Sequence, residues 1–250
     1  MTEIPDLIFL SIILYFMMHV LDSAAITSVV AGKLTDNLSQ GVSIHNSSVI
    51  AARLSLPLIL IISAFLIENR IMTLKEYLFY AILHLIPVIF MLIYVLRNTN
   101  IFQKFFQRVI FFRTTKSLPM AILSSTFSKK NNAKLIDFQE RFTFERIVFI
   151  KSFVASLAYI FIALGFFISF SLSYHFEDYR MTISQITTVF HGVGSVLIAF
   201  FIDPMLTKSI DLKNNKGIWI SNIYSIMFGR LLSYIAAVLI LFIYYLNVVN

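Results

Sequence analysis

Three charged side chains lie well inside long apolar stretches of this 250-residue sequence: Asp22, Arg53 and Arg230. An ionisable group in the middle of a membrane helix costs about 2.5–3.5 kcal/mol on insertion scales, so such groups seldom lack a role. The charges do not balance, because two arginines stand against one aspartate. An unmatched guanidinium in an apolar environment favours a planar anion, which it binds through two parallel hydrogen bonds. The three residues therefore predict a binding site for phosphate or pyrophosphate.

Two polar neighbours extend this predicted substrate site. His19 precedes Asp22 by three residues and shares its helix face, and Asn46 precedes Arg53 by seven residues on one face. A simpler interpretation is an internal ion pair, Asp22–Arg53 or Asp22–Arg230, that only fixes how the helices pack. The imbalance of charge favours the binding interpretation, with His19, Asp22, Asn46, Arg53 and Arg230 contacting the substrate.

Three further residues are candidates for ion coupling or gating. His191 stands beside Gly192 and Gly194, where helix backbones can approach closely, so packing explains it equally well. Asp203 precedes a proline and is expected at a helix end near the membrane edge. Lys151 is about one turn inside its apolar stretch, and its long side chain could simply reach the interface.

The sequence contains none of the patterns expected of common enzymes. It has no phosphate-binding glycine loop, no dinucleotide fingerprint, no zinc-protease motif and no nucleophile elbow. Its five histidines are scattered and it has no cysteine, so no metal-ligand spacing is present. We expect a protein that is not an enzyme and needs no cofactor or metal. Transport would then be driven by an ion gradient, the membrane potential or consumption of the substrate on the far side.

The composition excludes an ordinary soluble domain. Hydrophobic residues make up 58% of the chain and charged residues 13%, and the mean hydropathy is +0.84, whereas about a quarter of an average chain is charged. A helix needs roughly 20 mostly apolar residues to cross a membrane. Six stretches meet this length, which predicts an all-α, polytopic transmembrane bundle forming one integral membrane domain over residues 1–250: Leu7–Ala31, Val42–Ile67, Tyr77–Leu96, Ile147–Leu172, Ile183–Ile202 and Ile218–Leu246.

The basic residues predict the orientation. The net charge of +7 comes mainly from Lys and Arg between the third and fourth stretches and after the fifth, so the positive-inside rule explains it better than nucleic acid does. Both termini are then expected outside, with Asp22, Arg53 and Arg230 at similar depth. Acidic residues precede the first stretch, which we therefore interpret as a retained helix and not a cleaved signal.

Residues 97–146 are expected to form a basic cytoplasmic loop with its own helix. From Asn100 to Ile110, polar and apolar residues alternate with helical spacing, which predicts an amphipathic helix in the plane of the inner leaflet, in contact with membrane lipids. Ser117–Phe127 is apolar but too short to cross, and the remainder is expected to be helical outside the membrane.

At these positions the chain resembles the Amj family of lipid II flippases, which can substitute for MurJ in cell-wall synthesis. The resemblance covers roughly the first sixty and the last fifty residues. It consists of an ordered set of residues: His19-Val-Leu-Asp22-Ser23, Ala31-Gly32, Thr35, Ser43, Asn46, Arg53-Leu54, Pro57, Phe201-Ile-Asp203-Pro204, Leu206, Asp211, Gly217 and Arg230-Leu231. The chain departs from the family at Asp22-Ser23, where Glu-Thr is usual, at Ala52 and at Leu232-Ser233.

The resemblance implies translocation of lipid II, the undecaprenyl-pyrophosphate-linked disaccharide-pentapeptide, across the bacterial cytoplasmic (inner) membrane. The protein would then serve peptidoglycan synthesis, cell-wall biogenesis and cell shape. Six helices enclose little volume for so large a headgroup, so we expect a homodimer or larger assembly, or strong local thinning of the bilayer. Three alternatives stay open: an ion-coupled carrier of a small anion or another polyprenyl-linked glycan, an intramembrane enzyme acting on polyprenyl phosphates, and a membrane scaffold.

Overall fold

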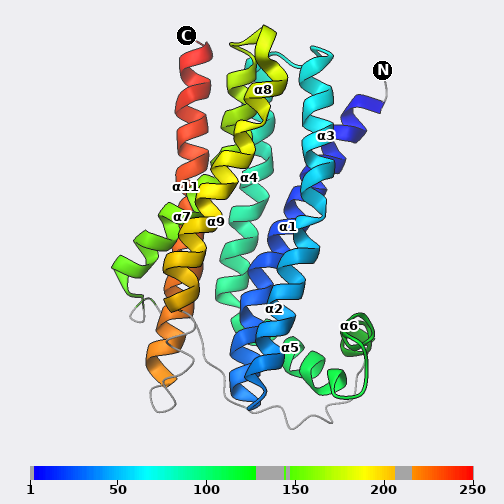
Figure 1. The fold of residues 1–250 in the computed structure, drawn as a ribbon, viewed down its shortest axis with the longest axis vertical. Coiled ribbons are helices and arrows are strands. Elements are labelled where there is room, and N and C mark those ends of the chain that lie inside the picture. Colours follow the sequence, from blue (N-terminus) through cyan, green and yellow to red (C-terminus); the bar gives the residue numbers. More distant parts are fainter. Residues whose placement is uncertain (1–2, 128–143, 145–146, 206–215, 250) are drawn as a thin grey trace.

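A computed structural model describes residues 3–127, 144, 147–205 and 216–249, and within these ranges the chain forms helices and no strands (Figure 1). The helices, in chain order, are α1 (Glu3–Leu34), α2 (Leu38–Arg53), α3 (Ser55–Glu68), α4 (Leu74–Arg97), α5 (Thr99–Arg113), α6 (Leu118–Phe127), α7 (Phe149–Ser173), η2 (Glu177–Tyr179), α8 (Arg180–Ser184), α9 (Ile186–Leu197), η3 (Ile198–Ile202) and α11 (Lys216–Val249).

Six helical stretches are long and apolar enough to cross a membrane, which confirms the predicted class of fold. Each of them overlaps one of the six stretches expected from the sequence: Pro5–Leu34, Leu38–Glu68, Leu74–Arg97, Phe149–Ser173, Thr182–Met205 and Ile220–Val248. The start of α1 and the end of α11 lie toward one end of the molecule, and α5 and α6 lie at the other (Figure 1). Which end faces the cytoplasm stays a prediction.

The second membrane stretch is broken at Leu54, between α2 and α3. Pro57 has no N–H with which to bond the carbonyl of Arg53, so the helical hydrogen-bond ladder is interrupted at this point. The N–H of Leu54 instead bonds the carbonyls of Ala51 and Ala52. The break places Arg53 at the last position of α2.

The fifth stretch is interrupted twice. α8 and α9 are separated at Gln185, and α9 passes into a π-helical turn, η3, directly before Asp203. Asp203 to Met205 are helical, and the described part of this stretch stops at Met205, so the expectation that Asp203 lies near a helix end stays a prediction. Pro204 lacks the N–H that the regular ladder needs, and a π turn is one way for a helix to accommodate such a gap. Residues 206–215, which include part of the predicted basic segment, lie outside the described ranges.

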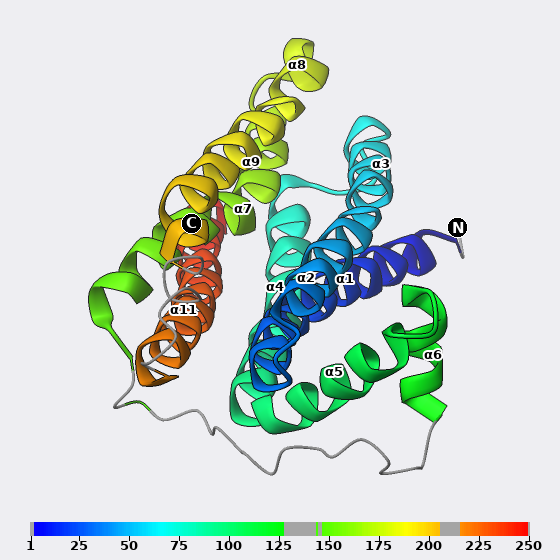
Figure 2. The ribbon, with the colours of Figure 1, turned by 60° about the horizontal axis from the view of Figure 1, so that its bottom comes forward.

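The helices form two groups with α4 between them: α1, α2 and α3 on one side and α7, α9 and α11 on the other (Figure 2). In the first group, α1 and α2 touch at Gly32 and Gly41. A methyl group added at Gly41 would lie 2.5 Å from the carbonyl oxygen of Ser28, so only glycine permits this spacing. The hydroxyl of Ser28 also donates to the carbonyl of Gly41 over 2.8 Å. α2 is therefore closely fixed to α1.

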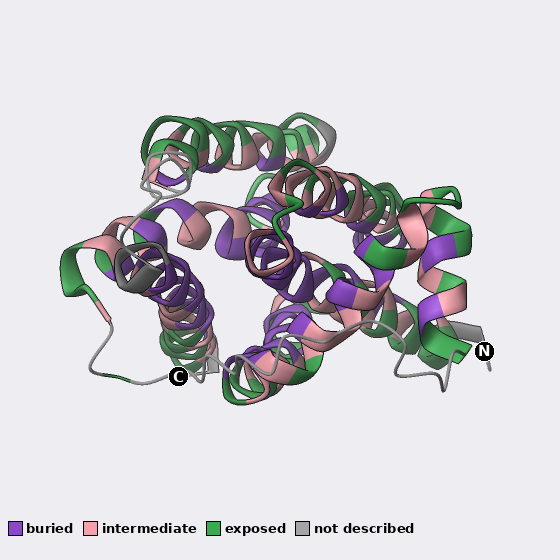
Figure 3. Cartoon of the chain, turned by 90° about the horizontal axis from the view of Figure 1, so that it is seen from below, coloured by how far each residue is buried: buried purple, intermediate pink, exposed green. Residues whose placement is uncertain are grey.

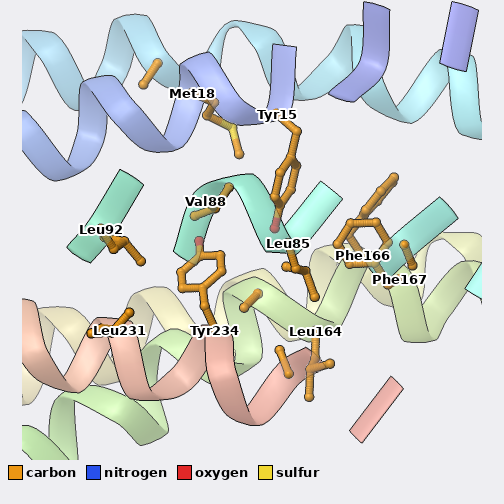
Figure 4. Close-up of a cluster of buried hydrophobic side chains, with 14 of the residues drawn as sticks. Tyr15, Met18, Leu85, Val88, Leu92, Leu164, Phe166, Phe167, Leu231 and Tyr234 are labelled. Atoms are coloured by element: carbon orange, nitrogen blue, oxygen red, sulfur yellow. The ribbon is translucent and has the colours of Figure 1, made fainter. Parts of the chain in front are cut away.

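In the second group, α9 packs on α7 at Gly194. A Cβ atom there would lie 2.7 Å from Ile162, whereas one at Gly192 would meet nothing within 4 Å. Of the two glycines beside His191, only Gly194 therefore marks a close approach. Buried residues gather toward the interior of the bundle when it is viewed from below (Figure 3). The core layer in Figure 4 includes Tyr15 from α1 and Tyr234 from α11.

α5 is a helix, as the sequence predicts, but part of its apolar face contacts protein. Phe106, Val109 and Ile110 are buried with Ala31 of α1 and Ile44 of α2. That the helix lies in the membrane interface stays a prediction. Of the basic loop 97–146, residues 128–143 and 145–146 lie outside the described ranges.

Candidate functional site

A cavity of about 500 Å³ opens between the two groups of helices, and α1, α2, α3, α4, α7, α9, η3 and α11 all line it. Seven of the eight residues expected to act from the sequence lie in its wall: His19, Asp22, Asn46, Arg53, His191, Asp203 and Arg230. These residues come from positions up to 211 apart in the chain. The fold therefore brings the predicted substrate residues and two of the predicted gating residues to one place.

Arg230 is held by a network of contacts on the α1–α11 side of the cavity. Its Nη2 donates to Asp22 Oδ2 over 2.6 Å and lies 3.2 Å from His19 Nδ1. The guanidinium also lies over the ring of Tyr159, 4.9 Å from its centroid, in a cation–π contact. The Arg230 side chain is only 7% exposed, and that of Asp22 is 26% exposed. Of the two ion pairs that the sequence left open, Asp22–Arg230 forms.

His19 links this ion pair to the aromatic core. Because a guanidinium can only donate, His19 Nδ1 must accept the hydrogen bond from Arg230, which makes the imidazole neutral with its proton on Nε2. The hydroxyl of Tyr234 lies 2.7 Å from the same Nδ1. The ring of Tyr15 meets the His19 ring edge-on at 4.3 Å between centroids. Three side chains thus fix the orientation of His19, which in turn helps to fix Arg230.

Arg53 stands in a different environment. It is exposed at the end of α2, lines the cavity, and has no hydrogen bond or ion pair with any residue that the structure describes. Asp203 also lines the cavity, so two carboxylates, and not one, accompany the two arginines. Asp22 nevertheless pairs with Arg230, and Arg53 pairs with neither. The arrangement of partners therefore leaves one guanidinium available to a ligand.

Several buried nitrogen atoms around the cavity also lack a hydrogen-bond partner among the described residues. They are His45 Nδ1, His191 Nε2 and Arg230 Nε. Buried polar atoms are nearly always hydrogen-bonded in folded proteins, so unpartnered ones need an explanation. The three residues line one cavity together with Arg53, so the wall of this cavity is rich in nitrogen-bearing side chains, which suits a polar, anionic group.

Lys151 is the one predicted site residue outside the cavity wall. It lies in the first turn of α7, partly buried, and its Nζ hydrogen-bonds to Asn222 of α11. This contact joins two neighbouring helices. A role for Lys151 in coupling or gating stays a prediction.

Sequence reasoning did not select three residues that the structure adds to the cavity: His45, Tyr159 and Ser195. His45 had a usable signal, because it is adjacent to Asn46 at the start of the second stretch. Ser195 follows His191 by four residues and therefore shares its helix face. Tyr159 had no signal, because nothing distinguishes it from the other ten tyrosines of the chain.

Within the described ranges no cluster of acidic, histidine or cysteine residues has the arrangement of a metal site. No protein-family model, curated protein or solved structure matches the chain. The resemblance to the Amj family stays a prediction. Of the residues on which that prediction depends, His19, Asp22, Asn46, Arg53, Asp203 and Arg230 line the cavity described above.

Proposed function

We propose that this protein translocates a lipid with a phosphorylated headgroup across the membrane, and that lipid II is its substrate. The main support for this proposal is the environment of Arg53. This cation lies on the wall of a cavity between helices long enough to cross a membrane, and it has no protein partner in the described ranges. Planar guanidinium groups bind phosphate through paired hydrogen bonds. The choice of lipid II follows from the resemblance to the Amj family.

Unpartnered atoms of other side chains support the same proposal. Arg230 Nε and two histidine nitrogens around the cavity could each contact an oxygen of a pyrophosphate. Asp22 and the rings of Tyr159 and His19 hold Arg230 in place before any ligand arrives. Such preorganisation reduces the entropy lost on binding.

The proposed direction of transport follows from the predicted orientation. With both termini outside, the end that carries α5 and α6 faces the cytoplasm, where lipid II is made. Lys104, Arg108, Arg113 and Lys116 belong to these helices and the turn between them. Basic residues at the inner leaflet would attract anionic lipid headgroups to the protein.

The size of the cavity limits what it can hold at one time. A volume of about 500 Å³ is typical of a small-molecule pocket, enough for a pyrophosphate with part of a sugar. The larger remainder of the headgroup would need further space, which is why we include a homodimer in this proposal. Full activity of single protomers in liposomes that hold one copy each would contradict the dimer.

A carrier of a small anion is the second candidate, and the limited cavity volume is the observation that favours it. The test is reconstitution of purified protein in liposomes with fluorescent lipid II and, separately, with radiolabelled phosphate. Lipid II that reaches the opposite leaflet unchanged, above the rate in protein-free liposomes, supports the flippase. Phosphate uptake without lipid movement would support the carrier, and release of phosphate from the lipid would support an enzyme.

A further inference from the structure

A second, smaller cavity of about 200 Å³ lies between the same two groups of helices. One wall consists of Leu60, Ile61, Ala64 and Glu68 from α3, and the opposite wall contains Phe170 of α7 with Ser184, Gln185, Thr187 and Thr188 from α8 and α9. In the first cavity, α2 and the start of α3 likewise face α9 and η3. The two cavities therefore follow one boundary, which we call the α3–α9 seam: α2 and α3 on one side, α8, α9 and η3 on the other.

The two sides of the seam pack mainly on other helices and only weakly on each other. Among the described helices, α2 packs mainly on α1, and α9 packs mainly on α7, whereas α2 and α9 are not among the pairs that pack closely. The helices on both sides are also interrupted, at Leu54 and at Gln185. A boundary with few direct contacts can widen at a lower cost than one through a packed core.

One face of α9 carries polar residues that line both cavities; we call this face the polar stripe. Thr187, His191 and Ser195 are spaced four residues apart and so lie on one face of the helix. Thr187 lines the smaller cavity, and His191 and Ser195 line the larger one. From Thr187 to Asp203 the helix advances roughly 24 Å, at about 1.5 Å per residue, which is most of the thickness of a hydrocarbon core of about 30 Å.

The stripe also contains polar atoms without a partner. Thr187 is 5% exposed, and its hydroxyl has no hydrogen-bond partner among the described residues, as is also true of His191 Nε2. The other side of α9 carries Val189 and Val193, which are exposed and suited to lipid. α9 thus presents an apolar face outward and a polar face to the seam.

A hydrogen bond crosses the seam at one end. Arg180 Nη1 of α8 donates to the carbonyl of Ile67 in α3 over 3.4 Å, beyond the smaller cavity. The larger cavity lies toward the other end, nearer to α5 and α6. The seam is therefore wider toward the end where the proposed substrate would enter and narrower toward the end where it would leave.

We propose that the α3–α9 seam is the path along which the phosphorylated headgroup crosses the membrane. The headgroup moves along Asp203, Ser195, His191 and Thr187 while the hydrocarbon chain stays in the surrounding lipid. This inference rests on the proposed function and adds the route to it. It requires the seam to widen and the contact between Arg180 and Ile67 to break in each cycle.

The test uses a cysteine pair across the seam, because the natural chain has no cysteine. Ala64→Cys with Thr188→Cys places one thiol on each wall of the smaller cavity. A cleavable crosslinker is expected to lower lipid II movement in liposomes by at least about tenfold relative to the same protein after reduction, because a bridged seam cannot widen. The control pair is His175→Cys with Tyr244→Cys, outside both cavities, whose native side chains lie 2.7 Å apart.

The possible outcomes of the crosslinking experiment test the proposed route and the proposed function separately. Equal transport in the bridged and reduced seam variant would overturn the route while leaving the function intact. Equal inhibition in the control pair would also overturn it, since bridging any two helices would then suffice. Absence of lipid movement in the wild-type and reduced proteins would instead refute the proposed function.

A second measurement does not depend on transport. Ser195→Cys is expected to react with a charged, membrane-impermeant methanethiosulfonate reagent at least about tenfold faster than Val193→Cys, because thiolates form in water and not in lipid. Ser195 lines the larger cavity, and Val193 lies on the opposite face of the same helix. Equal reaction rates at the two positions would overturn the inference that the stripe faces a polar path.

Discussion

Each side of the larger cavity contains one arginine, and the two arginines differ in burial and in their contacts with the protein. On the α1–α11 side, Arg230 is buried and contacts Asp22, His19 and Tyr159. On the α2–α9 side, Arg53 is exposed and has no partner in the described part of the chain. The charge of Arg230 is thus paired within the protein, whereas the charge of Arg53 has no counter-ion among the described residues. Depth in the membrane alone does not distinguish these two roles.

The largest effect is expected when the buried pair is broken. Asp22→Asn would leave the guanidinium of Arg230 buried without its counter-ion, and removal of one partner of a buried pair costs about 3–5 kcal/mol. We expect a loss of about 3 kcal/mol in the free energy of unfolding, at the lower end of that range, because Asp22 keeps some exposure. Denaturant unfolding of the purified protein in detergent measures this loss.

A double variant sharpens the comparison. Arg230→Met in the Asp22→Asn background removes the orphaned charge and is expected to recover most of the lost stability without recovering transport. If Asp22→Asn were as stable as the wild type, Arg230 would not depend on its carboxylate partner, and the contrast between the two sides would be wrong.

Arg53 should show the reverse pattern. Hydrogen bonds to charged groups contribute about 1.5–3 kcal/mol, so Arg53→Ala is expected to lower lipid II movement by roughly 10- to 100-fold. The free energy of unfolding should change by less than about 0.5 kcal/mol, as for other exposed positions. Arg53→Lys keeps the charge but not the planar fork, and an intermediate rate is expected.

The same variant can be tested in cells. Arg53→Ala should fail to rescue bacteria that lack MurJ, although the protein still inserts in the membrane, and Arg230→Ala should fail as well. Rescue at the wild-type level by Arg53→Ala would remove this residue from the substrate site but would leave the helical arrangement unaffected.

The smallest effect is expected at Lys151. Its amine contacts Asn222 outside the cavity, so Lys151→Met should change lipid II movement by less than about twofold and mainly alter local packing. The transport rate at several membrane potentials is the appropriate measurement. A change in the dependence on potential would support the role in coupling that the sequence suggested.

Much of the fold could be predicted because it follows from local sequence. Hydrophobic length alone placed the six membrane stretches, and Pro57 is the residue that accounts for the interruption after Arg53. The π turn before Pro204 was not predicted, because a proline is compatible with a helix end, a kink or a π turn, and the surrounding packing selects among them.

The site could be predicted only in part, for a different reason. Rare polar residues in apolar stretches identified seven residues of the cavity wall, from His19 to Arg230. Which arginine pairs with Asp22 depends on the helix neighbours and on helix rotation, and neither is contained in the spacing within one helix. Likewise, the apolar face of α5 had the pattern expected for lipid, yet Phe106 contacts protein, because both environments favour the same residue types.

The absence of a side chain at Gly41 has a consequence for any movement of this molecule. Gly41 and Gly32 let α2 pack directly against the backbone of α1, and Gly194 similarly lets α9 pack against α7, so each helix of a pair is expected to move together with its partner. A change in the width of the seam would therefore have to be a rigid-body rotation of one three-helix group against the other, with α4 as the hinge. Because Asp22 belongs to α1 and Arg230 to α11, their ion pair joins the two groups, and such a rotation would have to keep this pair near its axis or break it in every cycle.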